Sequence, residues 1–136
     1  MQSFHYAFKV KDIQSTKDFY ITILGCEQGR FTKNWIDFDF FGNQLSAHVS
    51  NNIPTPDYCG TVDGVKVPIP HFGCILTINQ FEDVKTKLEK AACKFIVKPQ
   101  TRYKDLKGEQ LTMFVEDFSG NPIEFKAFKN PDEIFE

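Results

Sequence analysis

The sequence lacks the features that mark membrane, disulfide-rich and nucleic-acid-binding proteins. No apolar run approaches the roughly 20 residues that a transmembrane helix needs, and no signal peptide is recognised before the first strand-like run. The four cysteines, Cys26, Cys59, Cys74 and Cys93, form no C-x-x-C pair, so neither a disulfide framework nor a cysteine zinc site is expected. The 16 Lys and Arg are balanced by 18 Asp and Glu, which disfavours binding through nucleic-acid phosphates. We therefore expect a cytoplasmic protein with reduced thiols, no membrane partner and no nucleic-acid partner.

The composition is that of a chain with a substantial core. Hydrophobic residues make up 41% of the 136 residues, and 15 of the 136 are Phe. This length suits one compact domain or two small modules that share a core. We predict a single domain over residues 1–136.

Three strand-like runs carry chemically active side chains on the face opposite their apolar residues. The runs are residues 4–10, 71–78 and 121–128, and alternation along each strand turns His5, His71 and Glu124 away from the apolar side chains. A fourth run, residues 45–50, does the same with His48. Two imidazoles and one carboxylate are the ligand set of non-haem Fe(II) sites with open positions and of several zinc or manganese sites. The sequence therefore predicts that the function depends on these side chains.

The same order of elements occurs twice along the chain: strand, helix, strands, turn and final strand. Asp12 is the expected cap of a helix over 13–24, and Asn79 that of an amphipathic helix over 80–92. Further strands are predicted at 35–40, 94–97 and 110–115, with Gly-Asn turns at 42–43 and 120–121. We place module one at about 1–50, a Pro-rich linker loop at about 51–68 and module two at about 69–130, before a short C-terminal tail.

Two local motifs resemble those of the vicinal oxygen chelate superfamily, which joins glyoxalases, extradiol dioxygenases and fosfomycin or bleomycin resistance proteins. Residues 18–25 are similar to its "FY...LG" helix end, and residues 117–124 are similar to its "D-P-S-G-N-x-x-E" hairpin, with Phe118 in place of the usual Pro. The resemblance implies an α+β fold in which two βαβββ modules form a cupped mixed sheet around a metal site. Residues 35–42, 70–73 and 124–128 look most like small predicted extradiol-dioxygenase-like proteins.

Transferred by position, the resemblance makes His5, His71 and Glu124 the metal ligands. It implies a divalent metal, with Fe(II) favoured and zinc, manganese, nickel or cobalt as alternatives. Aligning the Gly-Asn turns places Ser46, rather than His48, opposite Glu124, and His48 lies two residues further along the same face. His48 is therefore either a fourth ligand or, as we favour, a catalytic acid/base beside the metal.

The loop over residues 100–109 offers Arg102 and Tyr103 as substrate contacts, because a guanidinium group matches a carboxylate. The resemblance favours a metal-dependent enzyme with ring-cleaving dioxygenase-like chemistry on a small vicinal diol. A glyoxalase- or epimerase-like isomerase acting on a small carbonyl compound or thioester is the alternative within enzymes, and a small-molecule-binding resistance protein is the alternative outside them. A homodimer is expected, because two-module sheets of this size expose edges that a second chain commonly covers.

Overall fold

The computed structural model describes residues 2–136, which form two compact units. Unit one contains the residues up to Thr55 together with the turn Asp117–Asn121, and unit two contains Pro56–Glu116 and Pro122–Glu136. None of the helices in the described part of the chain is long and apolar enough to cross a membrane.

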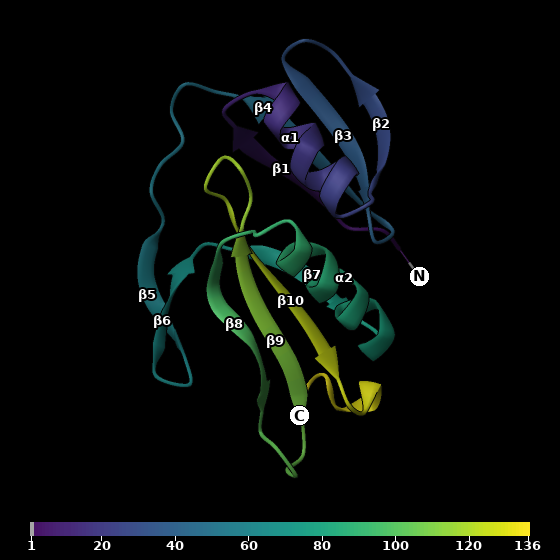
Figure 1. Ribbon diagram of the computed structural model, residues 1–136, viewed down its shortest axis with the longest axis vertical. Helices are drawn as coiled ribbons and strands as arrows, with labels where there is room; N and C mark the ends of the chain where they lie inside the picture. The colour runs from purple at the N-terminus through teal and green to yellow at the C-terminus, as the bar shows by residue number, and fades with distance from the viewer. Residues whose placement is uncertain (1) are drawn as a thin grey trace. The chain divides into compact units, whose positions relative to one another are not determined.

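Unit one is a four-stranded sheet with one helical segment against it (Figure 1). The strand order is β1-β4-β3-β2, in which β1 and β4 are parallel and the other pairs antiparallel. The elements are β1 (His5–Val10), α1 (Ile13–Lys17), the π-helix η1 (Asp18–Ile23), β2 (Glu27–Phe31), β3 (Trp35–Phe40) and β4 (Asn43–Val49).

The helical segment of unit one begins where the sequence predicts. The Asp12 carboxylate accepts a hydrogen bond from the Ser15 amide and so satisfies one of the free donors of the first turn. The predicted continuous α-helix is wrong in its second half, because α1 gives way to the π-helix at Asp18. Phe19 and Tyr20 are both fully buried there, and the Tyr20 ring contacts Phe8 of β1.

Unit two repeats the βαβββ order after an additional hairpin. Its main sheet has the order β7-β10-β9-β8, with β7 and β10 parallel, and Figure 1 shows α2 across one face of this sheet, next to β7 and β10. The elements are β5 (Asp57–Val62), β6 (Val65–Ile69), β7 (Phe72–Leu76), α2 (Ile78–Lys90), β8 (Phe95–Arg102), β9 (Gln110–Glu116), β10 (Pro122–Phe128) and the 3-10 helix η2 (Pro131–Glu133).

The start of α2 differs from the prediction. Thr77, not Asn79, is the N-cap: its hydroxyl accepts from the Gln80 amide, and the Gln80 side chain accepts from the Thr77 amide. This reciprocal capping box starts the helix at Ile78, so the preceding strand ends at Leu76. Phe81, Val84 and Leu88 are buried, as the amphipathic pattern predicts.

The predicted linker loop is partly wrong, because residues 57–69 form the hairpin β5–β6 with its turn at Asp63–Gly64. Val62 and Val67 of the hairpin join Val97 and Phe114 in a small apolar cluster within unit two. Burying these apolar side chains stabilises a hairpin that would be marginal alone. The hairpin ends next to His71, one of the predicted site residues.

The turn at Asp117–Asn121 is fixed within unit one by hydrogen bonds. The buried Asp117 carboxylate accepts from the Tyr20 hydroxyl at 2.8 Å, and the Ser119 hydroxyl accepts from the Lys11 amide. The Asn121 side chain donates both to the Lys9 carbonyl and to Asp117. The turn of the hairpin motif at residues 117–124, which resembles that of the superfamily, is thus also held in place by these hydrogen bonds.

Candidate metal centre

His71 and Glu124 lie together in unit two because β7 and β10 are neighbouring parallel strands. Glu124 is opposite Gly73 in the register of this pair, and His71 immediately precedes β7. The His71 Nε2 and Glu124 Oε1 atoms are 3.2 Å apart. Alternation correctly predicts that Glu124 faces away from Ile123 and Phe125, but β10 is covered on both sides, so Glu124 is only 8% exposed.

Gly73 allows the close approach of the two strands. A Cβ atom at this position would overlap the backbone carbonyl group of Glu124. Any larger residue at position 73 would therefore force β7 away from β10 and change the spacing between His71 and Glu124.

Hydrogen bonds from neighbouring groups fix the orientation of the His71 and Glu124 side chains. The His71 Nδ1–H donates to the Pro68 carbonyl of β6 at 2.7 Å, and in the metal-free protein the protonated ring also donates from Nε2 to Glu124. When the ring gives up its Nε2 proton, this nitrogen carries the lone pair that a metal would bind. The Thr112 hydroxyl of β9 donates to Glu124 Oε2 at 2.7 Å, and the His71 ring packs edge-on against Phe114. A backbone carbonyl bound to the far nitrogen and a hydrogen-bonded carboxylate are the usual supports of metal-binding His and Glu.

The donor pair fits a divalent metal. Two ligands about 2.1 Å from a metal and at right angles to each other are about 3 Å apart. The His71 Nε2 to Glu124 Oε1 distance of 3.2 Å is close to this value. Within residues 2–136, no group of three or more His, Cys, Asp or Glu side chains is gathered as a metal cluster.

The ionisation of the pair follows from its contacts. The hydrogen bond to Glu124 raises the pKa of His71, against the opposing effect of burial. Burial alone would raise the pKa of Glu124, but the hydrogen bonds from His71 and Thr112 and the charge of Lys126 together lower it. Glu124 is therefore an anionic donor at neutral pH.

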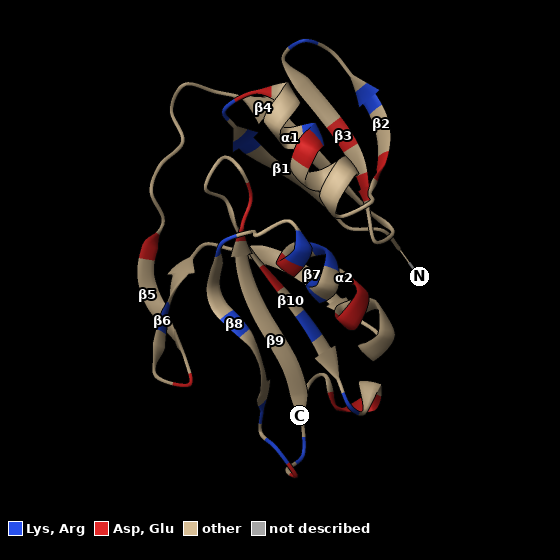
Figure 2. Cartoon of the chain, in the orientation of Figure 1, with Lys and Arg blue, Asp and Glu red and all other residues tan. Residues whose placement is uncertain are grey.

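These side chains border a cavity of about 260 Å³ in unit two. It is lined by His71, Phe72, Gly73, Cys74, Ile75, Glu124 and Lys126. The red and blue bands on β10 in Figure 2 mark the strand's one acidic and one basic residue, which are Glu124 and Lys126. The lining of the cavity thus combines charged or ionisable side chains with apolar ones.

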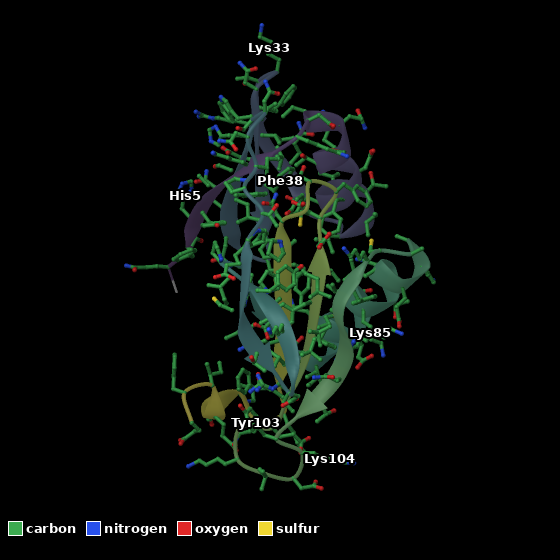
Figure 3. All side chains as sticks on the ribbon, turned by 90° about the vertical axis from the view of Figure 1, so that its left-hand side faces the viewer. His5, Lys33, Phe38, Lys85, Tyr103 and Lys104 are labelled. Atoms are coloured by element: carbon green, nitrogen blue, oxygen red, sulfur yellow. The ribbon has the colours of Figure 1, made fainter. Side chains whose placement is uncertain are left out.

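His5 occupies in unit one the place that His71 occupies in unit two. It is the first residue of β1, is opposite Gln44 of β4 and is exposed, and Figure 3 shows its side chain at that strand. Its Nδ1 lies 2.9 Å from the Gln44 Oε1 atom. Ser46, which the turn alignment matches to Glu124, donates a 2.6 Å hydrogen bond to Asp37.

His48 is exposed on β4 and stacks on Trp35, with 6.3 Å between ring centroids. Its partners across the two neighbouring strands are Lys9 and Trp35. It shares the face of Ser46, as predicted by alternation, and its role stays a prediction.

Arg102 and Tyr103 have partners of their own in unit two. The Arg102 guanidinium forms an ion pair with Asp63 of the β5–β6 turn, with 3.4 Å between Nε and Oδ2, and stacks over the Tyr103 ring. Tyr103 is 48% exposed in the loop that follows β8 (Figure 3). The predicted loop over 100–109 is wrong at its start, because Arg102 is the last residue of β8.

Two supporting residues were missed by the sequence analysis. Pro68 contributes only its backbone carbonyl, which no side-chain pattern reveals. Thr112 is fully buried on β9 between apolar residues, and a polar residue inside an apolar strand was the available signal.

The comparisons with known proteins agree with this fold. Residues 2–125 match the family described as the Glyoxalase/Bleomycin resistance protein/Dioxygenase superfamily. The chain belongs to this superfamily. The predicted vicinal oxygen chelate membership and the α+β fold with two βαβββ modules are thereby confirmed.

Several solved structures of this superfamily are similar over nearly the whole chain. A glyoxalase/bleomycin resistance protein/dioxygenase from Alicyclobacillus acidocaldarius is 29% identical with a TM-score of 0.79, covering 98% of this chain and 96% of that one. The fosfomycin resistance protein FosX from Listeria monocytogenes is 14% identical with a TM-score of 0.69, covering 98% and 95%. A glyoxalase family protein from Enterococcus faecalis is 21% identical with a TM-score of 0.66, covering 92% and 96%. The latter two support the fold alone, and no curated protein matches the sequence.

Proposed function

We propose that this chain is a divalent-metal enzyme of the vicinal oxygen chelate type, with His71, Glu124 and His5 as the metal ligands. The observation that carries the proposal is the orientation of His71 and Glu124 in unit two. His71 Nε2 lies 3.2 Å from Glu124 Oε1, and the His71 Nδ1–H donates a hydrogen bond to the Pro68 carbonyl. The Pro68 contact holds the ring so that its deprotonated Nε2 would face a metal beside Glu124. His5 is included because it opens the corresponding strand of unit one.

The proposed reaction is oxygen-dependent ring cleavage of a small vicinal diol. Two imidazoles and one carboxylate are the ligand set of Fe(II) oxygenases, and this set leaves positions open for two adjacent substrate oxygens and for O2. The metal would supply Lewis acidity to those oxygens and, as Fe(II), redox chemistry with O2. The hydrogen bond from Thr112 holds the Glu124 carboxylate in place, and Phe72 and Ile75 give the cavity apolar surface against which the carbon skeleton of a substrate would pack.

His48 is proposed to accept or return a proton at an imidazole nitrogen during this reaction. A fourth ligand at Ser46, where glyoxalase-type members carry Glu, is not supported, because its hydroxyl is short for such a ligand and already hydrogen-bonded to Asp37. The alternative of a fourth ligand, and with it the isomerase-like reaction, therefore rests on His48.

The first experiment is metal analysis of protein purified without oxygen, followed by dialysis of single variants. We expect one divalent metal per chain in the wild type and loss of most of it in His71→Ala and Glu124→Gln, because few donors remain to compensate. His48→Gln is the matched histidine control and should retain the metal. Full metal occupancy in dialysed His71→Ala would overturn the assignment.

Oxygen uptake with catechol as the probe diol then tests the reaction class. Fe(II)-loaded wild type should consume O2, whereas His48→Gln should do so roughly 10²- to 10⁴-fold more slowly, as expected for loss of a positioned proton carrier. A metal-loaded protein that isomerises a 2-oxo aldehyde hemithioacetal and leaves O2 untouched would instead support the glyoxalase-like alternative.

A further inference from the structure

Lys126 is a charged residue of the cavity to which neither the motifs nor the metal assignment gives a role. It lies on β10 two residues after Glu124 (Figure 2), on the same face of the strand. It also lines the same cavity as His71. Its side chain is 33% exposed, so Lys126 is partly accessible to a ligand from solvent.

The contacts of Lys126 leave its charge available. Its Nζ is 3.8 Å from Glu124 Oε2, which is longer than a hydrogen bond. That oxygen already accepts from Thr112 at 2.7 Å, and the other carboxylate oxygen faces His71. Among the residues the structure describes, Glu124 is the only acidic group within ion-pair distance of Lys126.

The positive charge of Lys126 would weaken metal binding if the metal were the only group bound in the cavity. One carboxylate and two neutral imidazoles leave a divalent metal with a net positive charge, and Lys126 adds another positive charge beside its carboxylate ligand. The repulsion is offset if the ligand that occupies the cavity is itself an anion. The apolar lining residues Phe72 and Ile75 suit a small carbon skeleton rather than a polar polymer.

We infer that Lys126 binds an anionic group of the substrate, so that the enzyme selects small carboxylate-bearing compounds with vicinal oxygens over neutral diols. The inference rests on the proposed function, because the vicinal oxygens are those expected at the metal. Lys126 supplies a charge-assisted hydrogen bond to the carboxylate, while His71 and Glu124 remain metal ligands.

Calorimetric titration of the zinc-loaded protein with oxalate tests the inference without any turnover. Oxalate presents vicinal oxygens and two carboxylates, and zinc is redox-inert. Oxalate affinity should fall about tenfold or more in Lys126→Met, as expected for loss of a hydrogen bond to a charged group. It should change little in Lys126→Arg, which keeps the charge. Lys98→Met, an exposed lysine on β8 that does not line the cavity, is the matched control and should bind oxalate as the wild type does.

Zinc affinity separates this inference from the proposed function. Lys126→Met should bind zinc as tightly as the wild type or more tightly, because a repelling charge has been removed. Equal oxalate affinity in wild type and Lys126→Met, or loss of zinc from Lys126→Met, would overturn the role of Lys126 and leave the metal assignment standing. Failure of the wild type to bind zinc or any other divalent metal would overturn both.

Discussion

Tyr20 and Asp117 show how single buried groups link distant parts of the sequence. The Asp117 carboxylate accepts four hydrogen bonds: from the Tyr20 hydroxyl, the Asn121 side chain and the Ser119 and Asn121 amides. Tyr20 is fully buried, and burial followed by the Asp117 charge raises its pKa well above 10.0. The hydroxyl therefore stays protonated and able to donate.

Tyr20→Phe should lower the free energy of unfolding by about 1–3 kcal/mol, because a buried carboxylate loses one donor. Tyr58→Phe, at a tyrosine that is 40% exposed, should change it by no more than about 0.5 kcal/mol. Urea denaturation followed by circular dichroism measures both. Equal stability of Tyr20→Phe and wild type would show that the hydrogen bond is not needed to hold the turn.

The His71–Glu124 ion pair should make the stability of the metal-free protein depend on pH. The pKa of Glu124 is lowered from 4.5, so its contribution is present above pH 4.5 and is lost as pH falls through the lowered value. The pKa of His71 is raised from 6.5, so its contribution is present below pH 6.5 and is lost as pH rises through the raised value. The ion pair therefore contributes most to the free energy of unfolding between pH 4.5 and pH 6.5.

Denaturation in EDTA at a series of pH values measures this profile. Relative to His71→Gln, the wild type should gain most stability between pH 4.5 and 6.5 and lose that advantage on either side. A wild-type advantage that is constant from acid to alkaline pH would contradict the coupling.

Alternation along β10 was enough to place Glu124 on the face opposite Ile123 and Phe125, whereas His71 precedes β7 and lies outside the strand. Alternation could not show that the Glu124 face is covered, because burial of β10 on both sides depends on residues far away in sequence. The Pro68 carbonyl was equally beyond prediction, since the hairpin that supplies it was not foreseen.

At the scale of elements, substitutions at the start of α2 can test whether Thr77 or Asn79 caps the helix. Thr77→Ala should destabilise the protein by about 1 kcal/mol, because the Gln80 amide loses its acceptor. Asn79→Ala, inside the first turn, should be neutral or slightly stabilising, because Ala has the higher helix propensity. Thermal unfolding of the two variants compares them directly, and a larger loss in Asn79→Ala would contradict the capping box.

The elements that sequence reasoning missed have weak local signals. All five residues of β2 are exposed, so this strand has no apolar alternation to detect. The prolines at 54, 56, 68 and 70 suggested a loop at the linker, although Asp63–Gly64 is a hairpin turn signal. For α2, the Thr77–Gln80 pair was the available sign of a capping box, but Asn79 competed with it.

At the scale of the whole molecule, the repeated order of elements was predictable because each module has its own strand, helix and turn signals. The four-stranded sheets leave β1 and β7 as end strands, each parallel to its only neighbour within its sheet. Ile75 on β7 is 47% exposed, and Phe4 just before β1 is 70% exposed. Sheet edges flanked by exposed apolar side chains are commonly covered by another chain.

We therefore propose that the protein is a homodimer and that β7 contributes to its interface. Light scattering after size exclusion at micromolar concentration should give twice the 15.7 kDa mass of one chain. Ile75→Lys should shift the protein toward the monomer, because a charge on an end strand opposes pairing with another chain. Leu106→Lys, at a residue that is 66% exposed in the loop between β8 and β9, is the control and should leave the mass unchanged. A wild-type particle of 15.7 kDa would exclude the dimer, whereas a dimer that withstands Ile75→Lys would place the interface away from β7.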